Sequence, residues 1–180
     1  LVFPQSLSSI GEGAFMFCNG LLDITFPANT LSVGEDAFSG CLDLKAVHIP
    51  HLTSWCQSDF ANYNANPLYY AQHLYHNGEE ITDLVVPEGT TSIGDHAFVG
   101  YTRLASVVLA SSVASIGIGA FSGCTSLSPT MELPTDLVHI AEKAFADCTG
   151  LYYITLPSGL VTLDRDAFMG CSSMKTVSCL

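Results

Sequence analysis

Apolar residues return along this chain in one recurring unit. The segment Ile10-Gly-Glu-Gly-Ala-Phe15-Met-Phe-Cys18 comes back as Val33-Gly-Glu-Asp-Ala-Phe38-Ser-Gly-Cys41. Related units start at Ile93, Ile116, Ile140 and Leu163. The repeat phenylalanines lie at positions 15, 38, 98, 121, 145 and 168, so successive positions differ by 23, 60, 23, 24 and 23. A fixed period of about 20–50 residues predicts a solenoid of stacked coils.

Each unit combines a strand pattern with a turn. The segment 151–157 ends in alternating apolar and polar residues, which predicts a half-buried strand. Pro157 ends this strand because it has no amide hydrogen to donate, and 160–163 forms a second short extended piece. The Phe of the unit fills the interior while the preceding Ala lets neighbouring coils approach. One coil cannot bury its own apolar side, so stacking supplies the core.

The third coil departs from the repeat sequence. Residues 52–60 align with the repeat if Trp55 takes the position of the repeat Ile and Phe60 that of the repeat Phe. The step from Phe38 to Phe60 is only one shorter than the usual period, which keeps Phe60 in phase. With this coil, the chain is predicted to hold about seven coils that share the period of 23.

An insert follows at about 61–80. Within it, Asn77-Gly78 favours the positive φ angles of a type I′ turn. We therefore predict a β-hairpin joining 73–75 to 79–86, with a polar loop or short helix before it. Two further irregularities are local: Tyr101 replaces the repeat cysteine, and one extra residue at 128–133 predicts a bulge where Pro129 weakens strand pairing.

Composition narrows the function classes. The 180 residues are 48% hydrophobic and 12% charged, enough for one domain with a sizeable core, and the net charge is −12. Nucleic acid is not an expected partner because phosphate binding needs clustered Lys and Arg. No apolar run reaches the roughly 18 residues of a membrane helix, so we expect no direct membrane insertion. Because the sequence opens and closes inside repeats, we interpret residues 1–180 as one domain cut from a longer array.

Five of the seven cysteines follow the repeat. They lie three residues after a repeat Phe: Cys18, Cys41, Cys124, Cys148 and Cys171. This phase predicts a ladder of buried thiols, since free Cys behaves as a small apolar residue. Coils about 4.8 Å apart leave open a disulfide between neighbours such as Cys148 and Cys171.

Candidate chemistry is sparse. His73 and His76 lie near two glutamates, but residues three apart on a strand face opposite sides, so we expect no metal site. No catalytic motif and no cofactor-binding motif is present, and we expect neither an enzyme nor a cofactor. Acidic residues should form a ridge along one edge, either for solubility or for weak calcium binding: Glu12, Glu35, Asp95, Glu142 and Asp164.

The predicted strand face is the best recognition surface. Its outward positions are Thr25, His48, Val108, Glu132, Thr155 and Ser178. Tyrosine is favoured at interfaces, and both the strands and the insert carry it. The candidate ligand-binding residues are Tyr152, Tyr153, His48, Lys45, Lys175, Tyr69, Tyr70 and Tyr75. In the alternative interpretation, Leu68, Tyr69 and Tyr70 cap an apolar flank of the solenoid.

The Ile-Gly-x-x-Ala-Phe-x-x-Cys units and the Leu-Pro strand ends resemble the BspA-type leucine-rich repeat family. The insert also resembles a variant repeat of Bacteroides-type members. The resemblance implies a right-handed solenoid with a parallel sheet on one face, located outside the cell, either secreted or at the outer-membrane surface. It implies adhesion or recognition and carries over no catalytic residue.

The functional hypothesis is therefore a non-enzymatic interaction module that adheres to a host or bacterial surface protein or glycan. One alternative is a carbohydrate-binding module, which several coplanar exposed aromatic side chains would favour. Another is a structural spacer between an anchor and a functional domain. Because solenoid ends expose apolar coil faces, we also expect end-to-end self-association of this fragment.

Overall fold

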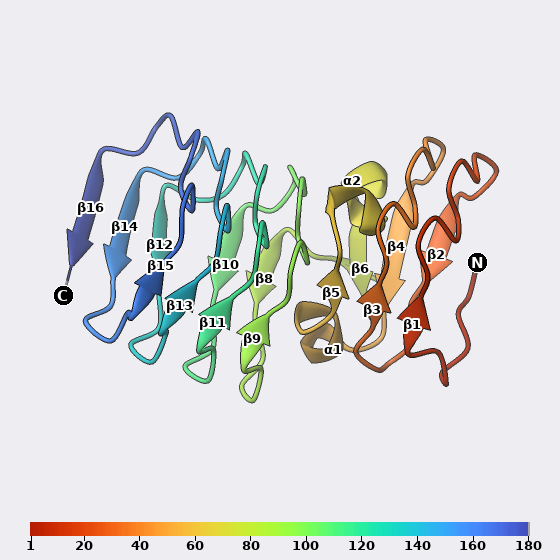
Figure 1. The fold of residues 1–180 in the computed structure, drawn as a ribbon, viewed down its shortest axis with the longest axis horizontal. Helices are drawn as coiled ribbons and strands as arrows, with labels where there is room; N and C mark the ends of the chain where they lie inside the picture. Colours follow the sequence, from red (N-terminus) through yellow and green to blue (C-terminus); the bar gives the residue numbers. More distant parts are fainter. Residues whose placement is uncertain (180) are drawn as a thin grey trace.

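The coils stack along one long axis in the computed structural model, which describes residues 1–179 (Figure 1). The two ends of the chain lie at opposite ends of this stack. A regular coil contributes one strand to each of two rows, and every pairing between coils is parallel. The protein is thus the β-rich repeat solenoid that the period predicts, with about seven coils of roughly 23 residues.

One row of strands forms what we call the long-strand face. Its members are β2 Asp23–Thr25, β4 Ala46–Ile49, β6 Leu74–His76, β8 Asp83–Val85, β10 Ser106–Val108, β12 Thr130–Glu132, β14 Tyr153–Leu156 and β16 Thr176–Cys179. The register places equivalent residues side by side, as in Ile24 opposite Val47 and Met131 opposite Ile154. These central residues point inward and are buried, as expected for alternation with period two.

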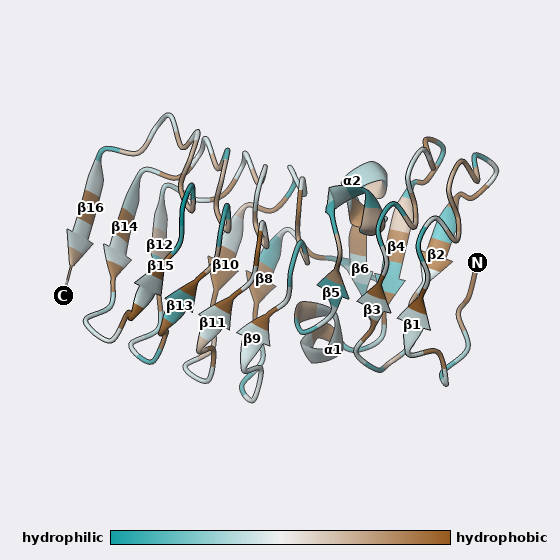
Figure 2. Cartoon of the chain, viewed as in Figure 1, coloured by the Kyte–Doolittle hydropathy of each residue, from teal (hydrophilic) through white to brown (hydrophobic). Residues whose placement is uncertain are grey.

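The second row is built from strands of two residues. They are β1 Ser9–Ile10, β3 Ser32–Val33, β5 Asp59–Phe60, β9 Ser92–Ile93, β11 Ser115–Ile116, β13 His139–Ile140 and β15 Thr162–Leu163. Brown apolar segments recur along the strands of both rows in Figure 2. The two rows therefore enclose a common core, which the repeat side chains fill.

Phenylalanine rings form a ladder through that core. Centroids of successive rings lie 5.2 Å apart for Phe15 and Phe38, and 5.3–5.4 Å apart along the series Phe98, Phe121, Phe145 and Phe168. The planes of each stacked pair lie within 9° of parallel. One side chain type at one position thus fills the interior of the regular coils, in one stack at Phe15 and Phe38 and another from Phe98 to Phe168.

The repeat cysteines form a second ladder. Within the described residues all seven thiols are free, and Cys41, Cys124 and Cys148 are buried. The thiols from Cys41 onward donate a hydrogen bond to the carbonyl of the repeat Phe in the coil before, as in Cys124 Sγ to Phe98 O at 3.2 Å. Burial raises the pKa of the Cys148 thiol above its ordinary value. The predicted ladder of thiols is confirmed in the interior coils, whereas Cys18 on the first coil is exposed.

The third coil differs from the prediction. Phe60 lies in β5 and pairs with Val33, so it occupies the position of the repeat Ile rather than that of the repeat Phe. Phe38 N donates to Asn64 O, as Phe15 N donates to Ala37 O one coil earlier. Ala65, the residue after Asn64, therefore stands where the next ring of the ladder would be.

A short helix explains this shift. Residues predicted to be extended form α1 Leu52–Cys56, with Trp55 packed edge-on against Phe26 and tilted against Phe60. A helix advances about 1.5 Å per residue against about 3.3 Å for a strand. The segment therefore covers less distance, and Phe60 reaches only the strand position.

The predicted hairpin is present. β6 pairs antiparallel with β7 Glu79–Glu80 through Asn77 (φ 53°) and Gly78 (φ 84°), both positive as a type I′ turn requires. The hairpin is shorter than predicted, because β8 leaves it to pair with β10. The 3₁₀ turn η1 Tyr63–Ala65 and the helix α2 Leu68–Ala71 come before it, in agreement with the expected short helix.

The predicted bulge interrupts the long-strand face. Ser128 N donates to Ala105 O of the preceding coil, whereas the carbonyl of the next residue, Pro129, accepts from Tyr152 N and Tyr153 N of the following coil. Two residues thus share the bonds that one residue makes in a regular coil. Proline also has no amide hydrogen to extend a ladder toward β10. Among the described strands, β12 pairs with β14 but not with β10.

Candidate functional site: the long-strand face

The outward positions predicted from the sequence lie on the long-strand face. Val108 and Glu132 are exposed, and Thr25, His48 and Thr155 are half-buried. Thr25 lies beside His48, and Thr155 beside Ser178, so these side chains form a row across the coils. Coil stacking therefore presents side chains at a regular spacing, as a recognition surface needs.

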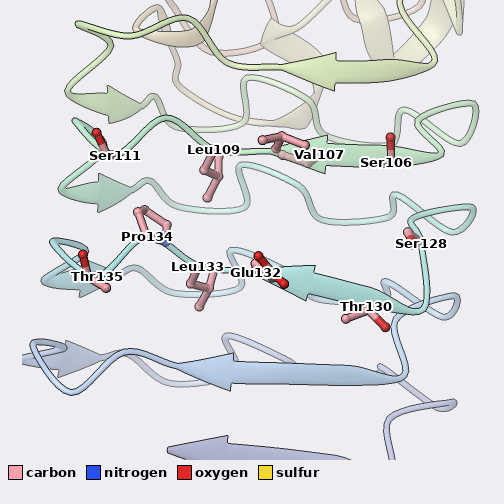
Figure 3. A pocket seen from close by; sticks show the side chains of 11 residues that line it. Ser106, Val107, Leu109, Ser111, Ser128, Thr130, Glu132, Leu133, Pro134 and Thr135 are labelled. Atoms are coloured by element: carbon pink, nitrogen blue, oxygen red, sulfur yellow. The ribbon is translucent and has the colours of Figure 1, made fainter. Parts of the chain in front are cut away.

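The gap between β10 and β12 opens a groove of about 430 Å³ on this face, which we call the sheet groove (Figure 3). Val107, Leu109 and Leu133 give it apolar walls. Its remaining lining comes from Ser106, Val108, Ser111, Ser128, Thr130, Glu132, Pro134 and Thr135. The groove joins apolar carbon to hydroxyl groups and one carboxylate, a mixture typical of small pockets that receive a side chain or ligand.

Tyr152, Tyr153 and Lys175 come together next to the groove. The two tyrosine rings meet edge to face with centroids 4.8 Å apart, and Lys175 Nζ lies 5.0 Å from the Tyr152 centroid. Tyr153 is 47% exposed. It pairs with Thr130, which lines the sheet groove. Tyr153 therefore lies on the strand next to the groove lining, with the half-buried Tyr152 packed against it.

His48 and Tyr75 form a separate cluster on the N-terminal coils. Their rings stack with centroids 5.1 Å apart. Beside them, His73 Nδ1 and Arg103 Nε lie 2.8 and 2.7 Å from Glu80 Oε1. The Arg103 guanidinium, with a smaller contribution from His73, holds the pKa of the Glu80 carboxyl below its ordinary value. This polar cluster ties the hairpin to the following coil.

The remaining candidate residues lie away from the sheet groove. Lys45 is exposed just before β4, the position that Tyr152 and Lys175 occupy on the C-terminal coils, so it belongs to a different part of the face. The Tyr70 hydroxyl donates to Asn64 Oδ1 at 2.6 Å and accepts from Gly40 N at 3.2 Å, which makes Tyr70 a support of the insert. Tyr69 lies on α2, is 39% exposed and faces a flank of the solenoid.

The expected acidic ridge is incomplete. Asp164 follows Leu163, which pairs with Ile140, so Asp164 takes the position of the repeat Gly and lies one residue away from the ridge. Arg165 fills the ridge position and pairs with Glu142 at 2.9 Å. Within residues 1–179, no three His, Cys, Asp or Glu side chains are grouped to hold a metal ion.

The sheet groove itself was not predicted. The signal for it is present in the sequence as the longer step from Phe121 to Phe145 and the proline at 129. Both indicate a local defect in pairing. The missing pairing with β10 opens a groove because β12 stays in register with β14 instead. The repeat pattern of a single coil does not show which neighbour a strand pairs with.

The family model for the BspA type leucine-rich repeat region matches residues 1–68 and 69–179, with six copies. The chain belongs to the BspA-type leucine-rich repeat family. Among curated proteins, none matches this BspA-type chain. No helix of residues 1–179 combines the length and the apolar character needed to cross a membrane.

Solved structures share the BspA-type fold. The chain is similar to the pneumococcal vaccine antigen PcpA at 19% identity and TM-score 0.65, covering 96% of this chain and 54% of that one. It is similar to a leucine-rich cell surface protein of Faecalibacterium prausnitzii at 23% identity and TM-score 0.51, covering 99% and 59%. A leucine-rich repeat protein of T. pallidum gives 24% identity and TM-score 0.50, covering 99% and 68%. The BspA-type chain thus spans little more than half the length of the first two.

Proposed function

We propose that this BspA-type array is an extracellular protein-binding module, used for adhesion through its long-strand face. The observation that carries the proposal is the position of the exposed Tyr153, which pairs with Thr130 in the lining of the sheet groove. A groove beside exposed aromatic rings is the arrangement that anchors protein interfaces. The family assignment supports an interaction module, and the names of two similar solved structures, a cell surface protein and a vaccine antigen, support a surface location.

The contact has a simple physical form. A partner inserts an apolar side chain between Leu109 and Leu133, which removes apolar surface from water on both molecules. Tyr153 supplies a rigid amphipathic surface beside this anchor, and tyrosine rings lose little conformational entropy on binding. Glu132 and Lys175 place opposite charges on the two sides of the tyrosine strand, which orients the partner.

Binding strength comes from repetition rather than from one deep site. The outward side chains are fixed to a rigid sheet, so contacts on several coils form together without reordering the protein. Nothing in this contact requires bond making or breaking, and we propose a binding scaffold rather than an enzyme. A longer array would add more such coils, and we propose that its partners bind across several of them in the same way.

The test is binding of the purified chain to an array of extracellular matrix proteins and glycans. We expect a protein signal that the double variant Tyr152→Ser/Tyr153→Ser reduces at least tenfold, because about 1.4 kcal/mol corresponds to a factor of ten. A Phe17→Ser variant is the matched control, since Phe17 is also an exposed aromatic side chain but lies in a turn of the first coil.

The two possible failures have different meanings. A protein signal that survives the double variant would remove the tyrosine pair from the site. Silence across all matrix proteins would overturn adhesion through these coils and favour the role of a spacer.

A further inference from the structure

A second hollow, of about 410 Å³, lies on the flank of the solenoid, away from the sheet groove. We call it the flank hollow. Its lining residues are Tyr63, Tyr69, His96, Val99, Gly100, Gly119, Ser122, Gly123, Lys143 and Asp147. Two tyrosines of the insert stand on one side, and two charged side chains of a later coil stand on the other. The floor consists of glycines and small residues.

The hollow arises from the absence of side chains at two repeated turn positions. Two residues before and two residues after each repeat Phe, the backbone has positive φ. Glycine is not obligatory there, because Phe17, His96, Lys143 and Asp147 adopt φ values of 53–58° at the same positions. The coil of Phe121 is the one with glycine at both positions, Gly119 and Gly123, among the six coils with a repeat Phe. At Gly40, Gly100 and Gly170, a side chain from the preceding coil or from the insert fills this space.

Neighbouring side chains show what fills the equivalent space elsewhere. A Cβ atom on Gly40 would lie 2.4 Å from the Phe17 ring, and one on Gly170 would lie 2.0 Å from the Asp147 carboxylate. A Cβ on Gly123 would meet only the backbone of Gly100, at 3.3 Å. Above Gly123, therefore, the space that a side chain covers in other coils stays open.

The aromatic wall is held rigidly. The Tyr63 and Tyr69 rings lie 5.3 Å apart at 58°, and Tyr69 covers Gly100. Gln72, at the end of α2, donates to the carbonyls of Tyr69 and Gly100, both at 2.8 Å. The buried Asn66 side chain donates to the carbonyl of His96 at 2.8 Å. The insert is thus fixed to the coils that form the floor, and the wall needs no rearrangement to receive a ligand.

The polar groups around the hollow are both donors and acceptors. Lys143 can donate, and its Nζ also lies 3.3 Å from Glu142 Oε1. Asp147, whose carboxylate reaches over Gly170, can accept, and the Ser122 hydroxyl can do both. His96 adds an imidazole whose buried Nδ1 has no hydrogen-bond partner among the described residues. Burial lowers the pKa of His96, so its ring is neutral near pH 7. An exposed aromatic face beside mixed donors and acceptors matches a molecule with an apolar ring face and hydroxyl groups around its edge.

We propose that the flank hollow binds a neutral sugar, with the ring stacked on Tyr63 or Tyr69 and its hydroxyls bonded to Lys143, Asp147 and Ser122. The charges of the protein favour a neutral ligand over an anionic or a cationic one. The protein carries a net charge of −12, which disfavours phosphorylated and other anionic ligands. Lys143 and Asp147 place opposite charges at the same wall, so a cationic ligand gains no net attraction there.

The experiment is saturation-transfer NMR with neutral oligosaccharides ending in glucose, galactose, mannose or N-acetylglucosamine. We expect millimolar or tighter binding of at least one sugar by the unmodified chain. Gly123→Asn places a side chain in the hollow and uses a residue that tolerates positive φ. Tyr63→Ser removes an aromatic face, and both variants should weaken binding about tenfold or more.

Two controls separate the sugar site from general damage. Gly13→Asn makes the same substitution at a positive φ in the first coil (φ 59°), away from the hollow, and should leave sugar binding unchanged. Tyr153→Ser changes only the long-strand face, and thermal melting checks that each variant is folded. Absence of saturation transfer from every sugar of the panel, or sugar binding that survives Gly123→Asn, would overturn the proposal.

Discussion

Deleting Pro129 should close the sheet groove. The residue is the extra one that makes the step from Phe121 to Phe145 longer than the steps on either side of it. It also lacks the amide hydrogen that would pair β12 with β10. Without it, β12 returns to the register that β8 and β10 already have. The deletion should therefore extend hydrogen bonding across the long-strand face and remove the space between Leu109 and Leu133.

The magnitude follows from the neighbouring ladder. The pairing of β8 with β10 joins three residue pairs, and an equal ladder would add about three hydrogen bonds worth roughly 0.5–1.5 kcal/mol each. Loss of a proline returns freedom to the unfolded chain, which costs about 0.4–1 kcal/mol. We expect a net rise of about 1–3 kcal/mol in the free energy of unfolding.

Urea unfolding measures this stability, and amide hydrogen exchange locates it. Exchange should slow in residues 106–109 and 130–133, where the new ladder forms. Binding of any protein partner that uses the groove should weaken in the same variant. Stability and binding therefore change in opposite directions, which a general loss of structure would not produce.

Pro129→Ala is the matched control, because it restores an amide hydrogen but keeps the extra residue. It should change exchange in 106–109 far less than the deletion. The reasoning would be refuted by a deletion variant that is less stable than the parent protein, or by one in which exchange stays fast on both strands.

Three further predictions concern the core and the hairpin. Phe121→Ala should lower the free energy of unfolding by about 3–5 kcal/mol. Phe168→Ala should lower it by less, because Phe168 is half-buried and stacks on one described ring. Equal urea midpoints for the two variants would contradict this. Burial raises the pKa of the Cys56 thiol to about 12, so this thiol should react slowly with iodoacetamide in the native protein near pH 8. Peptide mass spectrometry measures the labelling, and rapid labelling of Cys56 would disprove its burial. The ion pair lowers the pKa of Glu80 from its ordinary 4.5, so the charged Glu80 carboxylate stabilises the folded protein above that pH, and this stabilisation is lost as pH falls through the folded pKa. The difference in stability between the parent protein and Arg103→Ala should therefore shrink in acid. A difference that stays constant with pH would contradict the ion pair.

The regular coils were predictable from sequence because each position has one physical task. Period-two alternation gives the strands, and the repeat Phe and Cys give the two core ladders. The third coil was not predictable in the same way. Phe60 has the right spacing for the ring position, yet α1 shortens the path and moves it to a strand. Spacing along the sequence measures distance in space only while the local conformation is unchanged.

The candidate site was predicted in part. Outward strand positions and the cluster of Tyr152 with Lys175 follow from alternation and register. The opposite roles of Tyr69 and Tyr70, one lining a hollow and one supporting the insert, depend on helix orientation, which two adjacent letters do not encode. The flank hollow could have been found by reading the glycines at 119 and 123 as a column against the other coils.

The direction of the hydrogen bonds has a mechanical consequence. Bonds between parallel strands run across the strands, and here that direction is the long axis of the stack (Figure 1). Tension applied between the two ends therefore loads the bonds of one coil at a time, instead of shearing many at once. Each released coil of about 23 residues supplies roughly 75–80 Å of extended chain. Under pulling force, such an array lengthens in steps and absorbs work before the chain is fully extended.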